Sequence, residues 1–317
     1  MKAYMYHYTR EDSKDMPGAH YVNLSNFKNH ILEASPISKQ EFDSFLAKKG
    51  TDSIINYCKS LRHKSIFTFD DGIRDNLTAA SLLNEHGCTG IFFLCTRPYL
   101  DGKFLDVHLI HLAVYQRNVQ KVYQVFERLI DGNGEMRRQY TLFKESRDNT
   151  FNFYRDDEKR SSIKVFMNRY CPLKYRYYFM IEFINELGLN PSLDKFYLNV
   201  EDMYKLKEMG MVIGCHGHTH NLLSRLSPRS QEDEISKSTL FLNKRLNQRT
   251  HLFSYPYGRR QSYTYHTIKL LKKFGYNYAF SVNDSDLEQS RSFFELSRYN
   301  CNRLNNSFDN TKSNKST

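Results

Sequence analysis

Short apolar runs alternate with amphipathic stretches over the first hundred residues of the chain. Residues 66–69 and 91–95 are almost continuously apolar, as in strands buried on both faces, and residues 3–8 form a weaker, aromatic-rich strand pattern. Between the two strong runs, apolar side chains recur at helical spacing over residues 75–87. Strand, helix and strand with short connections predict an α/β fold on a parallel sheet.

Side-chain caps predict where three helices begin. Ser25 is placed to cap the first of them. Ser38, with Glu41 three residues later, gives the capping-box pattern of the second. Asp75 is placed to cap the third, directly after the first strong strand.

The pattern changes between about residue 98 and about residue 199. This stretch is highly charged, rich in Tyr and Phe, and helical in its periodicity, with no strong strand signal. We expect it to be a helical insertion within a single domain that spans residues 1–304. Residues 305–317 carry almost no apolar side chains and are expected to be disordered. Within the insertion and after it, helices are expected at 119–130, 176–187, 201–208 and 266–274, and strands at 211–214, 252–255 and 278–282.

Composition places the 317-residue chain among soluble globular proteins, with 40% hydrophobic and 26% charged residues. The formal net charge of +11 is compatible with an anionic partner, but no nucleic-acid-binding motif is present, so we expect no nucleic acid partner. No run reaches the roughly 18–20 apolar residues of a membrane-spanning helix. The N-terminus lacks a signal-peptide core, and the six cysteines show no CxxC spacing. These features predict a cytoplasmic protein with reduced thiols.

Two adjacent carboxylates end the first strong strand. Asp70 and Asp71 precede Gly72, and together they force a turn. Neighbouring carboxylates at such a position repel each other and lose hydration, so they need a counter-ion. The arrangement favours a metal ion.

Histidines follow the strand predicted at 211–214. His216 and His220 are four residues apart, so on a helical turn both imidazoles would face one ion, whereas His218 would point elsewhere. With one carboxylate of the Asp pair they make a two-histidine, one-carboxylate site with open coordination positions, which is typical of a catalytic ion. The other carboxylate would accept a proton from a water molecule activated by the ion. This chemistry predicts metal-assisted hydrolysis of a carbonyl compound.

Three segments resemble, in order, the first three motifs of the polysaccharide deacetylase family, which is carbohydrate esterase family four with the NodB homology domain. They are TFDDG at 68–72, HGHTH at 216–220 and YPYG at 255–258. The resemblance covers roughly residues 60–100 and 200–300. It implies a distorted (β/α) barrel and a divalent metal ion, usually Zn²⁺, although Co²⁺, Ni²⁺ or Mn²⁺ can serve.

The resemblance also implies roles for single residues. By motif position, Asp71, His216 and His220 would be the metal ligands, and Asp70 would be the general base. The backbone N–H of Tyr257 would help to stabilise the oxyanion. Pro256, in the same motif, is assigned with it to the oxyanion or substrate site.

Two positions depart from the family pattern. Ser254 stands where the third motif often carries an arginine, and Leu296-Ser297-Arg298 stands where the last motif usually offers Leu-x-His, whose histidine is the general acid. A branch of bacterial enzymes linked to surface-polysaccharide synthesis lacks both features and resembles this chain better. Arg298 is a candidate for orienting a carboxylate or phosphate of the substrate.

The general acid is therefore left open among four histidines. His218 lies beside the expected ligands, His7 follows the first predicted strand, and His108 and His111 lie at helical spacing within the insertion.

The expected function is metal-dependent removal of an acetyl group from an N-acetylated sugar, nucleotide- or lipid-linked forms included, in lipopolysaccharide or capsule synthesis. Two alternatives stay open. One is an O-acetyl esterase on the same fold, because an alkoxide leaving group needs less help from an acid. The other is a catalytically weak, sugar-binding pseudoenzyme. The sequence indicates no oligomeric state.

Overall fold

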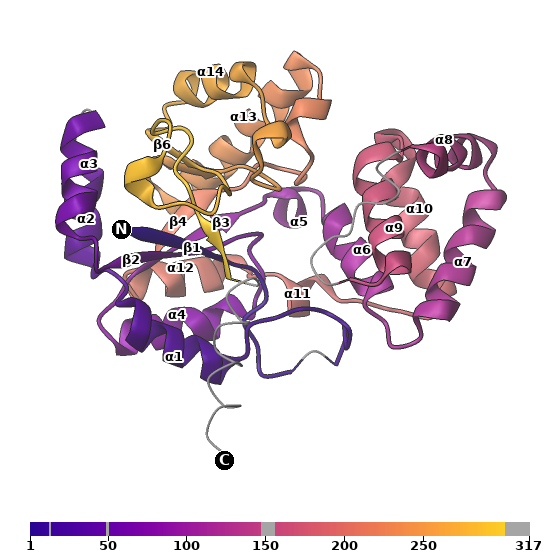
Figure 1. Ribbon diagram of the computed structural model, residues 1–317, viewed down its shortest axis with the longest axis horizontal. Coiled ribbons are helices and arrows are strands. Elements are labelled where there is room, and N and C mark those ends of the chain that lie inside the picture. Colours follow the sequence, from indigo (N-terminus) through magenta and orange to yellow (C-terminus); the bar gives the residue numbers. More distant parts are fainter. Residues whose placement is uncertain (13, 49–50, 147–155, 302–317) are drawn as a thin grey trace, which may run out of the picture. The chain divides into compact units, whose positions relative to one another are not determined.

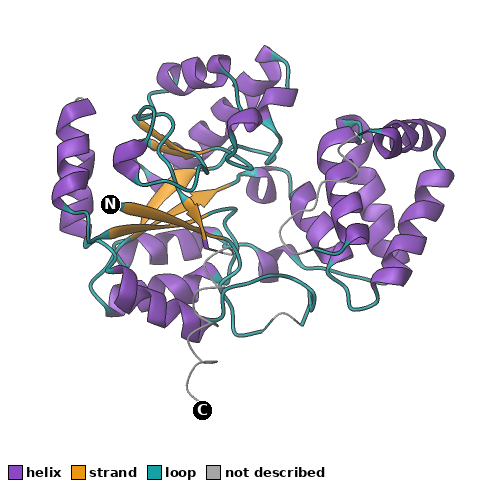
Figure 2. Ribbon diagram, viewed as in Figure 1, coloured by secondary structure: helices purple, strands orange, loops and turns teal. Residues whose placement is uncertain are grey.

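A parallel sheet is the centre of the larger part of the chain (Figure 1). In the described residues it has seven strands in the order β6-β5-β4-β3-β2-β1-β7, and every neighbouring pair is parallel. The strands are β1 (Lys2–Tyr6), β2 (Ser65–Phe69), β3 (Gly90–Leu94), β4 (Val212–Cys215), β5 (Leu252–Ser254), β6 (Tyr278–Phe280) and β7 (Tyr299–Asn300). They form a curled half-barrel surrounded by helices (Figure 2). The distorted (β/α) barrel predicted from the sequence is confirmed.

The structure, a computed structural model, describes residues 1–12, 14–48, 51–146 and 156–301. The expectation of disorder at 305–317 falls outside these residues. The chain divides into two compact units, of which the first contains the sheet. The second comprises residues 12–20 and 103–192 and includes most of the segment expected to be an insertion.

Helices cover both faces of the sheet. Successive strand side chains point to opposite sides, so the apolar strands present apolar side chains on both faces, and these are buried against helices. Phe67 and Phe92 belong to one apolar cluster with residues of α1, α4, α12, α13 and α14, while Ile91 and Phe93 belong to another with α2 and α3. The helices of the first unit are α1 (Leu24–Ala34), α2 (Lys39–Leu46), α3 (Thr51–Ser60), α4 (Asn76–Glu85), α5 (Arg97–Leu100), α11 (Leu193–Phe196), α12 (Val200–Glu208), α13 (Pro228–Leu246) and α14 (Tyr265–Lys273).

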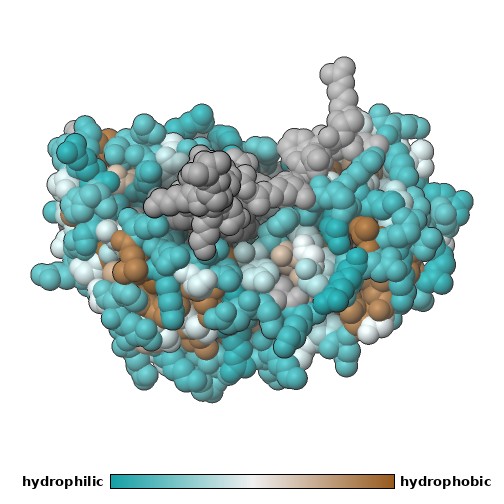
Figure 3. Space-filling view, turned by 60° about the horizontal axis from the view of Figure 1, so that its bottom comes forward, coloured by the Kyte–Doolittle hydropathy of each residue, from teal (hydrophilic) through white to brown (hydrophobic). Residues whose placement is uncertain are grey.

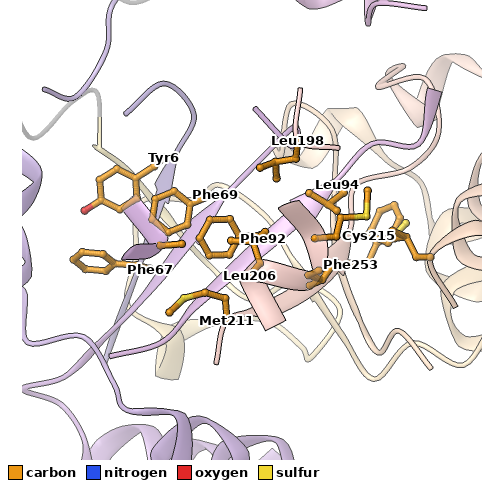
Figure 4. Close-up of a cluster of buried hydrophobic side chains, with 14 of the residues drawn as sticks. Tyr6, Phe67, Phe69, Phe92, Leu94, Leu198, Leu206, Met211, Cys215 and Phe253 are labelled. Carbon is orange, nitrogen blue, oxygen red and sulfur yellow. The ribbon is translucent and has the colours of Figure 1, made fainter. Parts of the chain in front are cut away.

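Aromatic rings from β1, β2 and β3 pack together within the first of these clusters (Figure 4). The ring of Phe69 stacks on Phe92 with centroids 4.5 Å apart and on Tyr6 with centroids 5.2 Å apart. Each fully buried Phe contributes roughly 1.5–3 kcal/mol by leaving water. These rings hold β1, β2 and β3 together just below the strand ends that carry the candidate chemistry.

The second unit contains helices and connecting loops, with no strand among its described residues. It contains α6 (Asp106–Val114), α7 (Val119–Asp131), α8 (Gly134–Glu145), α9 (Glu158–Val165), a π-helical turn (Phe166–Tyr170) and α10 (Leu173–Glu186). Phe126 lies at the centre of its core, with ring centroids 6.0 Å from Phe166, 5.8 Å from Phe179 and 5.7 Å from Phe183. The buried ion pair of Arg176 with Asp106 joins α10 to α6, and the pair of Lys164 with Asp156 joins α9 to the residues just before it.

Helix starts agree only partly with the sequence prediction. The capping box of Ser38 and Glu41 on α2 is confirmed. The helix α1 is capped by Asn23 instead of Ser25, and the side chain of Asp75, at the start of α4, pairs with Arg10 instead of capping. The local sequence pattern does not show which nearby polar side chain caps a helix, or that a side chain such as Asp75 pairs with a distant residue instead.

The surface shows no sign of a membrane-spanning element in the part of the chain that is described. None of its helices is long and apolar enough to cross a bilayer. On the face in Figure 3, hydrophilic residues predominate and hydrophobic ones form small separate groups. All six cysteines are free, and all but Cys88 are buried.

Candidate active site

The three sequence motifs follow β2, β4 and β5. Because these strands are parallel, their carboxyl ends lie at one edge of the sheet, where α/β folds usually place catalytic residues. The register pairs Leu94 of β3 with Cys215 of β4, and Cys215 in turn with Phe253 of β5. Segments far apart in sequence, at 70–72, 216–220 and 255–258, thus leave the sheet at the same edge.

Asp71, His216 and His220 form a buried three-residue cluster. Oδ1 of Asp71 lies 3.4 Å from Nε2 of His216 and 3.3 Å from Nε2 of His220. Two ligands each about 2.1 Å from a tetrahedral zinc ion are about 3.4 Å apart, so these distances fit one shared ion. The residues are 1–6% exposed. Three protein ligands leave a coordination position open, as catalytic sites require.

Backbone bends, not a helix, bring these side chains together. His216 and His220 lie in a loop, so the expected helical turn is wrong. The loop turns at Gly217, with φ of 81°, and at His220, with φ of 60°. Asp71 also has a positive φ, of 77°. Left-handed conformations are costly for residues with a Cβ and tend to occur at functional sites.

A backbone carbonyl fixes the tautomer of His216. Its Nδ1–H donates to the carbonyl oxygen of Ser254 over 2.7 Å, which leaves the lone pair on Nε2 facing Asp71. Burial lowers the pKa of His216, but the charges of Asp70 and Asp71 outweigh burial and the net shift is upward. The negative charge that favours a proton on His216 also favours a cation at this point.

Asp70 is held beside this cluster by a buried arginine. Arg298 Nη1 donates to Oδ1 and Nη2 donates to Oδ2, both over 2.8 Å. The same guanidinium donates to the hydroxyls of Thr68 and Ser254, and the Ser254 hydroxyl is 3.3 Å from Asp70 Oδ2. Burial raises the pKa of Asp70, but Arg298, His216 and His7 together outweigh burial and keep the pKa below its usual value. The carboxylate is therefore ionised and fixed in orientation.

The position of Arg298 corrects its expected role. We expected it to orient an anionic group of the substrate, but the residue is 0% exposed and its guanidinium lies over the ring of Phe93. Its three nitrogens donate to Asp70, Thr68, Ser254 and the carbonyl of Ser281. Arg298 therefore acts on Asp70 from within the core.

The four candidate histidines occupy different surroundings. His218 is 3.0 Å from the Thr96 hydroxyl through Nδ1 and 3.3 Å from Asp101 through Nε2. His7 directly follows β1, whose Tyr6 pairs with Phe69, so His7 is level with Asp70 on the neighbouring strand. Burial lowers the pKa of His7 against the opposing charges of Asp71 and Asp70. The other two, His108 (buried) and His111, belong to α6 of the second unit.

Tyr257 and Pro256 border the cluster from the loop after β5. The ring of Tyr257 lies 4.9 Å from the ring of His220, and its φ of 64° turns the backbone at this point. Pro256 is buried next to Gly217, where an added Cβ would meet its Cγ at 3.9 Å.

The roles of two residues of the site were not predicted from the sequence. Ser254 was noted only as a departure from the motif, yet it contacts His216, Asp70 and Arg298. Glu234 lies on α13, a helix that was not predicted, and it accepts hydrogen bonds from the loop between the two histidines. No local sequence signal marks either contact, because both join segments distant in the chain.

Comparison of the sequence with known protein families gives one match. The sequence profile of the family described as polysaccharide deacetylase matches residues 183–279, which include the histidine loop and the YPYG motif. The resemblance to the polysaccharide deacetylase family is confirmed. The TFDDG motif lies outside the matched range, but the structure brings it to the same site.

A curated relative carries the name of the same family. The curated protein YxkH of Bacillus subtilis (strain 168), named as a polysaccharide deacetylase, is 28% identical over 104 residues. That match spans 33% of this chain and 36% of the relative's length.

Solved polysaccharide deacetylases share the fold. The Streptococcus pyogenes deacetylase PplD in complex with acetate aligns with a TM-score of 0.53 and 15% identity, covering 95% of this chain and 91% of that chain. A polysaccharide deacetylase from Bacillus cereus aligns with a TM-score of 0.50 and 12% identity, covering 94% of this chain and 64% of that one.

Proposed function

We propose that this chain is a metal-dependent carbohydrate deacetylase that removes the acetyl group from an N-acetylated sugar. One observation carries the proposal: Oδ1 of Asp71 is 3.3–3.4 Å from both histidine Nε2 atoms, with the carboxylate of Asp70 beside them. A second carboxylate outside the three-residue cluster, fixed next to it by Arg298, fits a general base.

We assign each residue a role from its contacts. A divalent ion held by Asp71, His216 and His220 would polarise the acyl carbonyl and lower the pKa of a water molecule. Asp70, whose Oδ2 is 3.7 Å from His216 Nε2, takes the proton of that water. Arg298 keeps the carboxylate of Asp70 ionised and fixed in orientation. The backbone N–H of Tyr257 supports the developing oxyanion.

His7 is our choice for the acid that protonates the leaving amine. The strand register places it level with Asp70, so it belongs to the same strand-end edge. His218 is engaged with Thr96 and Asp101, which favours a structural role. With a pKa lowered by burial, His7 gives up its proton readily once it has been charged.

The substrate class rests on the family and on charge. The family name indicates acetylated polysaccharide, and the net charge of +11 favours an anionic polymer or a phosphate-bearing carrier, nucleotide or lipid. We therefore propose a role in the synthesis of a cell-surface polysaccharide, with Zn²⁺ as the first metal to test.

Acetate release from a panel of N-acetylated sugars and oligosaccharides, with Zn²⁺ and with chelator, tests the proposal. We expect release that stops with chelator, and a loss of about 10²- to 10⁴-fold in Asp70→Asn with zinc binding retained. No release from any sugar at saturating zinc, or an unchanged rate in Asp70→Asn, would contradict it. Bound sugar without turnover would instead indicate a pseudoenzyme.

A second candidate function is O-acetyl ester hydrolysis. The observation that favours it is the position of Arg298. This residue stands where the family usually has the histidine that acts as general acid, and its guanidinium is bound to Asp70. An ester leaving group needs less protonation than an amine. O-acetylated sugars in the same panel decide this point, because an esterase releases acetate from them alone.

A further inference from the structure

A buried carboxylate of α13 holds the loop that joins the two histidine ligands. Glu234 is 8% exposed. Its Oε2 accepts from the backbone N–H of His218 over 3.0 Å and from that of Thr219 over 2.8 Å, and its Oε1 accepts from the Thr219 hydroxyl. One side chain thus binds three donors between His216 and His220.

The loop needs such support because it has left the sheet. The bends at Gly217 and His220 prevent the regular pairing that a strand or helix gives to backbone groups. Its carbonyls are bound from another side: the N–H groups of Thr96 and Arg97 donate to the carbonyls of Gly217 and His218. The loop is therefore clamped between the start of α5 and Glu234.

The charge of Glu234 makes this contact unusual. Among the described residues no lysine or arginine forms an ion pair with Glu234, and three hydrogen-bond donors compensate the burial of its carboxylate. A buried charge without a cation is seldom the most stable choice for a core position, and three well-placed donors are what it requires. A glutamine would still offer an oxygen acceptor to the backbone N–H groups of the loop, without the cost of burying a charge.

We propose that Glu234 is a positioning residue that sets the spacing of His216 and His220 and thereby the affinity of the metal site. The inference rests on the proposed function, because it needs that site to bind an ion. Fixing the loop keeps both Nε2 atoms within reach of Asp71 Oδ1 before an ion arrives. Partners outside the ligand set typically change metal affinity by about 10- to 100-fold.

Zinc affinity, measured by competition with a chromophoric chelator, tests the proposal in wild type, Glu234→Ala and Glu234→Gln. We expect Glu234→Ala to weaken zinc binding about 10- to 100-fold and Glu234→Gln at least about threefold, with saturating zinc restoring most of kcat. Glu232→Gln is the matched control, because Glu232 lies on the same helix but is exposed and paired with Lys273. It should bind zinc as wild type does.

The outcomes separate three cases. Zinc affinity within about threefold of wild type in both Glu234 variants, even with lowered thermal stability of the metal-free protein, overturns the inference and leaves a structural role. If Glu234→Ala does not fold, Glu234→Gln decides by the same limit. If wild type binds zinc no better than Asp71→Ala, the proposed metal site itself fails. Weakened binding with an unchanged circular dichroism spectrum supports the positioning role.

Discussion

The pair of Asp70 and Arg298 joins residues 228 positions apart in the chain and is the most buried ion pair at the site. Arg298 is 0% exposed and Asp70 is 2% exposed. Burying two charges brings little net stability, but removing one leaves the other without a counter-charge. The contact therefore constrains both positions together.

Arg298→Ala should lower the free energy of unfolding by about 3–5 kcal/mol, because Asp70 is left buried and unpaired. In an Asp70→Asn background the same substitution should cost much less. Urea denaturation of the four proteins gives the coupling. Arg259→Ala is the control, since Arg259 is partly exposed in its pair with Asp284 and should cost about 0–1 kcal/mol. Equal losses in both backgrounds would contradict the assignment.

His7→Gln tests the acid. We expect a loss of about 10²- to 10⁴-fold with an N-acetylated sugar and a much smaller loss with 4-nitrophenyl acetate, whose leaving group departs without a proton. His111→Gln, in the second unit, should leave both rates near wild type. Similar losses of His7→Gln on both substrates would show that His7 has another role.

At the scale of elements, helix ends show how close polar residues compete. Asn23 caps α1 by accepting from the N–H of Asn26, while the hydroxyl of Ser25 donates to the Asn23 side chain. Asn23→Ala should therefore cost about 1 kcal/mol of stability. Ser25→Ala, the residue favoured by sequence, should change it by less than about 0.5 kcal/mol. If thermal denaturation shows a larger loss of stability in Ser25→Ala than in Asn23→Ala, Ser25 is the cap, as the sequence predicted.

A buried ion pair of the second unit gives a pH dependence. Burial raises the pKa of Asp156, but the imidazole of His20, 3.7 Å away, and the charge of Lys164 together outweigh burial, so the net pKa lies below its ordinary value. The stability that the charged carboxylate contributes is present above about pH 4 and is lost as the pH falls through the folded-state pKa.

Asp156→Asn should thus be less stable than wild type by about 3–5 kcal/mol at pH 7, and the difference should shrink below about pH 4, where wild type also loses the charge. Denaturation across pH 3–8 measures it. Asp43→Asn, whose exposed carboxylate pairs with Lys39, should change stability by less than about 1 kcal/mol. A difference that stays constant on acidification would rule out the charge as its source.

At the scale of the whole molecule, strands and motifs were predictable where one local rule decides. Continuous apolar runs identified the central strands, and their order fixed the shared edge. Helix α13 was missed because its buried side includes Gln231, Glu234, Ser238 and Thr239, which hide the amphipathic pattern. The residues proposed as metal ligands could be singled out from the sequence because each follows a strand. The contacts of Arg298 and Glu234 were not, because they depend on how distant segments pack.

Metal binding should also appear in global stability, because an ion held by side chains of two strand-end loops binds the folded chain only. At a zinc concentration of 100 times the dissociation constant, we expect about 2.7 kcal/mol of added stability and a higher melting temperature in wild type. Asp71→Ala should show neither. An equal rise in both proteins would place the ion elsewhere.

The left-handed backbone at Asp71, His220 and Tyr257 has a consequence for how this site can change over time. Glycine would relieve each position, yet at Asp71 and His220 it would also delete a side chain that the proposed chemistry uses. A sequence released from selection for activity therefore gains stability by replacing these residues with glycine. Descendants that no longer react should be recognisable by glycines at these positions, within a sheet that is otherwise intact.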